Sequence, residues 1–89
     1  MYRVEWRPPA VDELADFWIS ADPPTRAMLT AAAAEIDRKL SENPHAVGES
    51  RERGERIDFV YPLSYTFRVD GASQMVVVLH VRVYQQRRS

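Results

Sequence analysis

Three side chains near the C-terminus, those of His80, Arg82 and Tyr84, have the residue types that bind or transform a phosphate group. They lie at intervals of two within the apolar run 75–84, and successive strand residues point to opposite faces. An imidazole moves protons near neutral pH, a guanidinium binds phosphate oxygens through paired N–H groups, and a phenol donates a proton or stacks on a base. The spacing therefore predicts a strand whose polar end forms a site for phosphate chemistry.

The alternation of this strand also predicts which face meets the core. Val77, Leu79, Val81 and Val83 form the expected core face, and Val76 and Val78 share the other face with the polar residues. Non-catalytic interpretations stay open. His80 can be a strand histidine with one satisfied hydrogen bond, Arg82 can pair with a carboxylate, and Tyr84 can be an aromatic residue at a strand end.

The elements that must position these residues follow from hydrophobic spacing. Residues 2–6 alternate as a strand. Ala10–Ser20 and Pro24–Leu40 have helical periodicity, with Asp22 as an expected N-cap of the second helix. Three more strands are expected over about 56–61, 64–69 and 75–84. The fold class is therefore predicted to be α+β, in the order β-α-α-β-β-β. We expect one domain over residues 1–89, with a helical hairpin on one face of a small, mainly antiparallel four-stranded sheet.

The same alternation predicts an open polar face on this sheet. Its expected members are Arg56, Asp58, Ser64, Thr66, Arg68, His80, Arg82 and Tyr84. The aromatic residues expected in the core are Trp6, Phe17, Trp18, Phe59 and Phe67, with Ile57 and Tyr61 on the same side as Phe59.

Composition excludes several classes of function. The chain has no cysteine and only two histidines, His45 and His80, so the sequence predicts no metal site and no disulfide. It has no nucleotide-binding glycine motif, so no cofactor is expected, and no apolar run of the roughly 20 residues that cross a bilayer. The formal net charge is −1, but residues 1–45 carry 5 basic and 8 acidic side chains and residues 46–89 carry 7 and 5. An anionic partner would therefore meet the C-terminal half.

Three segments resemble the RelE/ParE superfamily of toxins from type II toxin–antitoxin modules: the opening YRVEW, the helix end RKLSENP and the run GERIDFVYPLSYTFRVDGASQMVVVLHVRV. The resemblance implies a cytoplasmic toxin bound by a cognate antitoxin. RelE-like members are ribosome-dependent endoribonucleases (mRNA interferases), whereas ParE-like members inhibit growth by poisoning DNA gyrase. A non-catalytic member is the third alternative.

Carried over by position, the resemblance implies Arg56, Arg82 and Tyr84 as catalytic candidates, and Arg51 and Arg53 as candidates for nucleic-acid or phosphate binding. His80 is a further catalytic candidate because of its residue type, and the basic side chains of Arg68, Arg87 and Arg88 are further candidates for nucleic-acid or phosphate binding. The chain departs from the RelE-like pattern at Ser64, where an arginine is usual, and at Gln85 and Gln86, where histidine, tyrosine or basic residues are frequent. Asp58 also places a negative charge on the expected open face. These departures leave the alternatives open.

Overall fold

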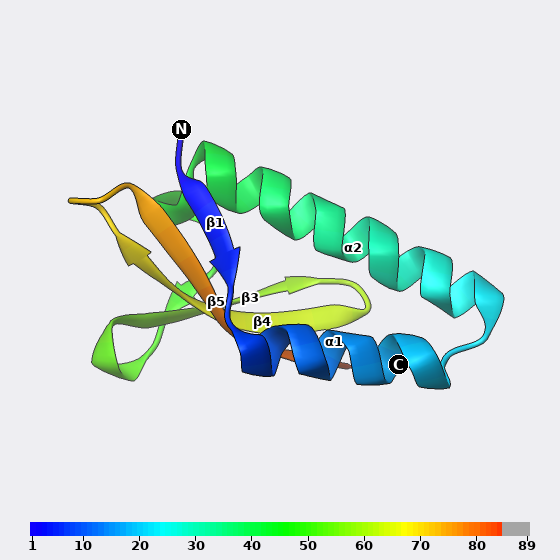
Figure 1. The fold of residues 1–89 in the computed structure, drawn as a ribbon. Helices are drawn as coiled ribbons and strands as arrows, with labels where there is room; N and C mark the ends of the chain where they lie inside the picture. Colours follow the sequence, from blue (N-terminus) through cyan, green and yellow to red (C-terminus); the bar gives the residue numbers. More distant parts are fainter. Residues whose placement is uncertain (85–89) are drawn as a thin grey trace, which may run out of the picture.

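The computed structural model describes residues 1–84 (Figure 1). Its elements are strand β1 (Arg3–Trp6), helices α1 (Pro8–Ser20) and α2 (Pro23–Glu42), a short 3-10 turn (Pro44–Ala46), strand β2 (Glu49–Ser50), a second short turn (Glu52–Gly54), and strands β3 (Glu55–Val60), β4 (Leu63–Asp70) and β5 (Met75–Val83). This arrangement confirms the predicted α+β class. Within the described part of the chain, no helix combines the length and apolarity needed to span a membrane.

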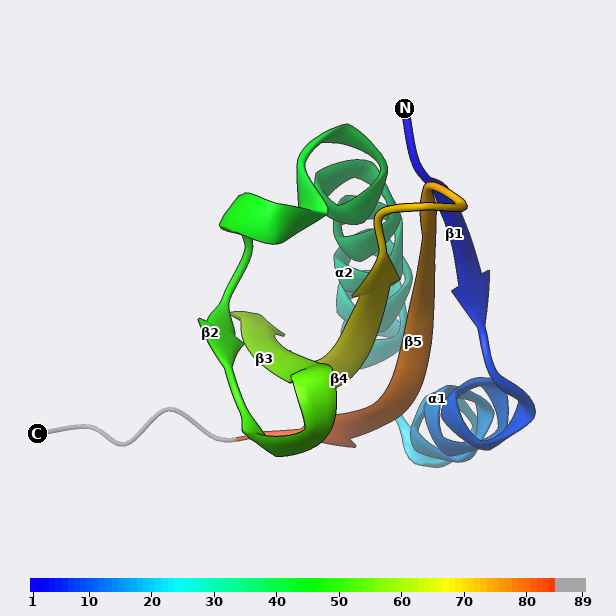
Figure 2. The ribbon, with the colours of Figure 1, turned by 90° about the vertical axis from the view of Figure 1, so that its left-hand side faces the viewer.

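The sheet has five strands in the order β1-β5-β4-β3-β2 (Figure 2). β1 pairs with β5 in parallel, and the other neighbours are antiparallel. The fifth strand, absent from the predicted four, is the two-residue β2, which pairs with Arg56 and Ile57 of β3. Such a short strand lies within a charged connector and leaves no periodic signal, because alternation needs at least four residues.

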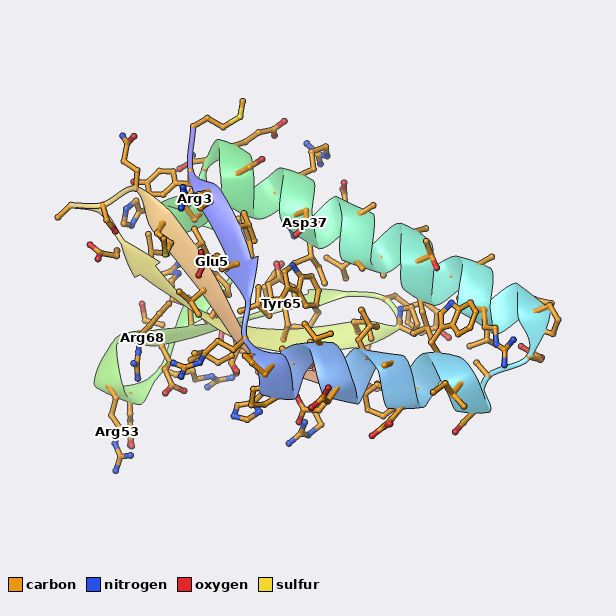
Figure 3. The ribbon with its side chains drawn as sticks, viewed as in Figure 1. Arg3, Glu5, Asp37, Arg53, Tyr65 and Arg68 are labelled. Atoms are coloured by element: carbon orange, nitrogen blue, oxygen red, sulfur yellow. The ribbon has the colours of Figure 1, made fainter. Side chains whose placement is uncertain are left out.

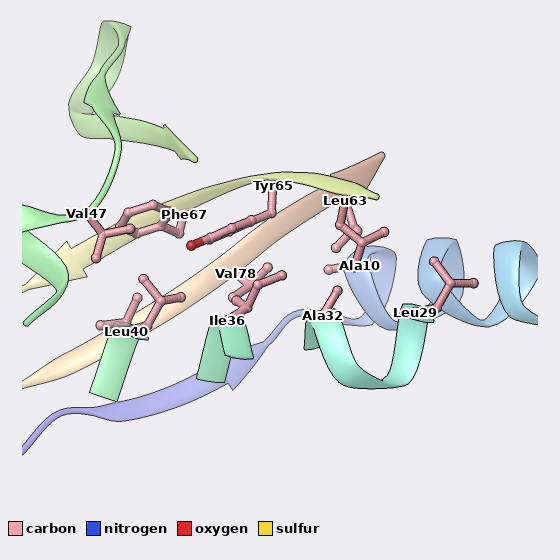
Figure 4. Packing of buried hydrophobic residues seen from close by; sticks show 12 residues of the cluster. Ala10, Leu29, Ala32, Ile36, Leu40, Val47, Leu63, Tyr65, Phe67 and Val78 are labelled. Atoms are coloured by element: carbon pink, nitrogen blue, oxygen red, sulfur yellow. The ribbon is translucent and has the colours of Figure 1, made fainter. Parts of the chain in front are cut away.

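Helix α2 forms where capping and periodicity agree. The Asp22 side chain accepts a hydrogen bond from the Thr25 backbone N–H at 2.9 Å, and prolines follow at the first helical positions. The stripe Leu29, Ala32, Ile36 and Leu40 is buried against the sheet. Figure 4 shows these side chains facing Leu63, Tyr65, Phe67 and Val78, which form the other half of the core.

Helix α1 lies beside β5, beyond the point where β1 ends (Figures 1 and 2). It is joined to α2 by Arg26, which donates to the Trp18 and Ile19 carbonyls and stacks its guanidinium 4.4 Å from the centre of the Trp18 ring. Trp18 is 42% exposed. Its prediction as a core residue is therefore wrong, because stacking on Arg26 takes the place of burial.

The face assignment of β3 is reversed relative to the prediction. A two-residue turn pairs Val60 with Leu63, which puts Asp58 opposite Tyr65 and Arg56 opposite Phe67. Directly opposed residues share a face, so the even-numbered side chains of β3 point toward α2. Phe59 then lies on the open side and is 52% exposed, so its prediction as a core residue is also wrong.

Strand β5 changes face partway along its length. Thr66 pairs with His80 but Phe67 pairs with Val78, so Leu79 is an extra residue in a β-bulge. Before the bulge the core side chains are Val76 and Val78, and after it Val81 is buried. Of the predicted core set Val77, Leu79, Val81 and Val83, only Val81 is buried. Val77 and Leu79 are wrong because an uninterrupted alternation was assumed, and Val83, near the end of the strand, is 43% exposed.

Candidate functional site

The sheet face opposite α2 carries most of the polar side chains of the three long strands, and we call it the open face. The register assigns to it Glu55, Ile57 and Phe59 of β3, Ser64, Thr66 and Arg68 of β4, and Val77, His80 and Arg82 of β5. Figure 3 shows the contrast, with Tyr65 between the sheet and α2 and Arg68 on the other side of β4.

His80 and Arg82 lie together at the β5 edge of this face, where they meet Glu13 of α1. The Glu13 carboxylate accepts hydrogen bonds from the Val81 backbone N–H at 3.0 Å and from Arg82 Nη1. Nδ1 of His80 lies 3.4 Å from the same carboxylate. The carboxylate therefore joins the helix to the edge of β5 and to the side chains of both candidate residues, His80 and Arg82.

The environment keeps Glu13 ionised. Its partial burial would raise the pKa of the carboxyl group, but the hydrogen bonds from Val81, Arg82 and His80 outweigh that effect and hold the pKa below its ordinary value. Glu13 is a residue of the candidate site that the sequence did not reveal, because its partners in β5 are 67 to 69 residues away along the chain.

Arg56 does not point to the open face. Its guanidinium donates to the Val47 carbonyl at 3.0 Å, to the Ser50 hydroxyl at 2.9 Å and to the Gly48 carbonyl at 3.2 Å. These bonds fix the connector between α2 and β3. The predicted grouping of Arg56 with His80 and Arg82 on one face is therefore wrong.

Asp58 also faces α2 rather than the open face. Its Oδ2 accepts from Lys39 Nζ at 2.7 Å and from the Tyr65 hydroxyl at 2.6 Å. Burial would raise the pKa of Asp58, but these two partners more than compensate and lower it. The negative charge of Asp58, which the sequence analysis placed on the open face, therefore lies on the α2 side of the sheet and is paired with Lys39.

The other arginine candidates surround the start of β3. Arg68 lies on the open face and pairs with Glu55 at 3.1 Å. Arg53 is exposed on the adjoining turn, and Figure 3 shows it on the same side of the molecule as Arg68. Arg51 is exposed, and its Nη2 lies 3.9 Å from Oε2 of Glu49. Arg87 and Arg88, like Gln85 and Gln86, lie outside the described residues.

Tyr84 follows β5 and belongs to an aromatic cluster with Phe59 and Tyr61. Its ring meets theirs edge-to-face, with centroids 5.3 Å and 5.7 Å away. Its backbone N–H donates to the Pro62 carbonyl at 3.0 Å. Phe59 and Tyr61 are about half exposed, so the cluster offers aromatic surface to a ligand. This surface lies near Arg82, because Ser64 of β4 pairs with Phe59 on one side and with Arg82 on the other.

A depression of about 340 Å³ continues the open face toward α1. Its lining includes Arg7, Glu55, Arg68, Leu79 and His80. Arg7 directly follows β1, and the fold brings it beside residues from β3, β4 and β5. The open face thus combines cationic side chains with two carboxylates, Glu13, which pairs with Arg82, and Glu55, which pairs with Arg68.

Comparison with known proteins identifies solved structures that share this fold. No family model matches the chain, and no curated protein matches its sequence significantly. Solved structures do match. The RelBE2 toxin–antitoxin complex of Mycobacterium tuberculosis has a TM-score of 0.76 at 24% identity, covering 93% of this chain and 91% of that one. The chromosomal ParDE system of P. aeruginosa has a TM-score of 0.73 at 19% identity, covering 96% and 98%.

A third match is a YoeB/ParE toxin from Agrobacterium tumefaciens, with a TM-score of 0.67 at 19% identity, covering 93% of this chain and 99% of that one. The agreement extends over nearly the full length of each protein. It includes the helical hairpin and the mainly antiparallel sheet expected from the sequence. The chain therefore has the RelE/ParE fold.

Proposed function

We propose that this chain is the toxin component of a type II toxin–antitoxin module, a cytoplasmic protein neutralised by a cognate antitoxin. The observation that carries the proposal is the match to toxin and toxin–antitoxin structures over more than nine-tenths of this chain. A match of that extent leaves little room for an additional catalytic or binding domain within these 89 residues.

The exposed surface of α1 supports a protein partner. Val11, Trp18 and Ile19 are 49%, 42% and 66% exposed, and with Leu14 and Ala15 they line an apolar hollow of about 310 Å³. Exposed apolar surface gathered along one helix is typical of a protein interface. We propose that the antitoxin covers this helix and extends toward the sheet, where its acidic residues would pair with Arg82.

The open face favours ribosome-dependent mRNA cleavage as the toxic activity. In such a reaction the RNA 2′-hydroxyl attacks the adjacent phosphorus and the P–O5′ bond breaks, so no protein nucleophile is needed. His80 and Tyr84 are the groups on this face that can take and supply the two protons. Arg82 would stabilise the charge that develops on the phosphate oxygens.

Gyrase poisoning is the second candidate, and two observations favour it. Arg68 and Arg82 are each paired with a carboxylate of the same chain, which reduces the positive field available for RNA. The ParDE structure also matches almost as well as the RelBE2 structure, with TM-scores of 0.73 and 0.76. A gyrase poison would act through surface shape and would not need the proton-transfer groups.

Induced expression of the chain without a partner tests both candidates. We expect wild-type protein to arrest bacterial growth, and Arg82→Ala and Tyr84→Phe to relieve the arrest at matched protein levels. Tyr84→Phe keeps the contacts with Phe59 and Tyr61 and removes only the hydroxyl. Arg3→Ala, an exposed arginine of β1, is the matched control and should remain toxic.

The outcomes separate the candidates. Relief by both variants, together with ribosome-dependent cleavage at mapped mRNA ends, would support the interferase. Arrest by both variants, with trapped gyrase–DNA complexes, would support gyrase poisoning. A folded wild-type chain that neither arrests growth nor copurifies with a small antitoxin from its native cells would refute the toxin proposal.

A further inference from the structure

The contact between α1 and β5 contains a carboxylate that reaches three groups of the strand at once. Glu13 Oε1 accepts from the Val81 backbone N–H at 3.0 Å, and Oε2 accepts from Arg82 Nη1. The Glu13 side chain is 24% exposed, whereas those of His80 and Arg82 are 55% and 61% exposed. The carboxylate is thus the most enclosed of the three side chains, and a backbone group fixes one of its oxygens.

This arrangement limits how Arg82 can point. Nη1 donates both to Glu13 and to the Val81 carbonyl, the latter at 3.0 Å, so one edge of the guanidinium is tied to the strand. Within residues 1–84, the Nε and Nη2 groups of Arg82 make no hydrogen bond. The free part of the guanidinium can therefore meet a ligand without losing its attachment.

His80 is constrained in a comparable way. Its Nδ1 faces the carboxylate at 3.4 Å, and within the described residues its Nε2 makes no hydrogen bond. A carboxylate beside Nδ1 favours the neutral tautomer that carries its proton there, which leaves Nε2 as the acceptor. A solvent-exposed imidazole without such a neighbour prefers the opposite tautomer.

We propose that Glu13 is a positioning residue that fixes the tautomer of His80 and the orientation of Arg82 on the open face. The inference deepens the proposed function and rests on it, because a fixed His80 tautomer and a fixed Arg82 orientation matter only if a reaction or a specific ligand uses the open face. Glu13 itself touches neither ligand nor reacting atoms. It acts through its two neighbours, from an element that the strand sequence alone could not implicate.

The test uses ¹⁵N spectra of the histidine rings in the full-length chain, with the His80 signals assigned from a His80→Asn variant. We expect wild-type His80 to carry its proton on Nδ1. Glu13→Gln preserves the shape of the side chain but removes the charge, and it should shift the Nδ1 resonance of His80 toward the unprotonated, pyridine-type position. Asp16→Asn removes the same charge from an exposed position on the same helix and should leave the spectrum unchanged.

Growth arrest provides the second readout. If positioning matters, Glu13→Gln loses toxicity although it makes the open face more positive, whereas Asp16→Asn stays toxic. The proposal is overturned if wild-type His80 carries its proton on Nε2, or if Glu13→Gln leaves the tautomer unchanged. The wild-type spectrum decides the matter even if Glu13→Gln does not fold. A wild-type chain without toxicity but with the expected tautomer would refute the proposed function and leave the positioning role intact.

Discussion

Replacing Asp58 by alanine should destabilise the protein far more than a surface substitution. Asp58 Oδ2 accepts from the Tyr65 hydroxyl at 2.6 Å and from Lys39 Nζ at 2.7 Å, which joins β3 to β4 and to α2. Tyr65 is 1% exposed, so its hydroxyl has no access to water once the acceptor is gone. Leaving a buried hydroxyl without a hydrogen-bond acceptor lowers the free energy of unfolding by about 1–3 kcal/mol.

The loss of Lys39 as a partner adds less. Its side chain is 29% exposed, so the ammonium can turn toward water, and pairs with that freedom contribute roughly 0–1 kcal/mol. Together the two terms give a loss of about 1–4 kcal/mol in the free energy of unfolding. At about 4–8 °C per kcal/mol for a domain of this size, that corresponds to a fall in Tm of roughly 4–32 °C.

A double-mutant cycle with Tyr65→Phe tests the cause. In the wild type, Tyr65→Phe removes one hydrogen bond and should cost about 1 kcal/mol. In the Asp58→Ala background it removes the stranded hydroxyl and should be neutral or stabilising, which gives a coupling of about 1–3 kcal/mol. Urea denaturation followed by circular dichroism measures all four proteins, with the exposed Glu49→Ala as a control that should change stability by less than about 0.5 kcal/mol. Additive effects of the two substitutions would refute the reasoning.

Three further outcomes can be checked by the same denaturation assay. Gly48→Ala should destabilise by about 2 kcal/mol or more, because φ is +68° and the added Cβ would lie 2.1 Å from the Ile57 carbonyl oxygen. Asp22→Ala should cost about 1 kcal/mol by removing the cap on the Thr25 N–H, whereas Asp22→Asn should cost less. Because the pKa of Asp58 is lowered from 3.8, its stabilising contribution is present above that value and should be lost as the pH falls below it; Asp58→Asn should flatten this acid dependence.

The helices were predictable because their signals are local. The Asp22 cap and the proline after it lie next to each other in the chain, and the stripe from Leu29 to Leu40 repeats at helical spacing. Burial of that stripe follows from any sheet placed against it. Such features do not depend on which strand pairs with which, so the sequence alone predicted them correctly.

The faces of β3 were not predictable in this way. Its two alternating sets each contain apolar and polar members, so the choice between them depends on the pairing register set by the two-residue turn. The set with Arg56 and Asp58 can face α2 because Arg56 finds carbonyls in the connector and Asp58 finds Lys39 and Tyr65. Polar residues tolerate an inward position where such partners exist, and partners distant in sequence leave no periodic signal.

The association of Glu13 with Arg82 follows from where β1 ends. Pro8 and Pro9 stop the strand after Trp6, and the last bond from this connection to β5 is from the Arg7 N–H to the Val78 carbonyl. Beyond that point β5 has no strand neighbour on this side, so the Val81 N–H would lack a partner. Helix α1 fills the space, and Glu13 supplies the missing acceptor. A carboxylate that accepts from the Val81 N–H lies beside the next residue, Arg82, which is 69 residues from Glu13 in the chain. The end of β1 at two prolines thus determines which charge Arg82 meets on the open face.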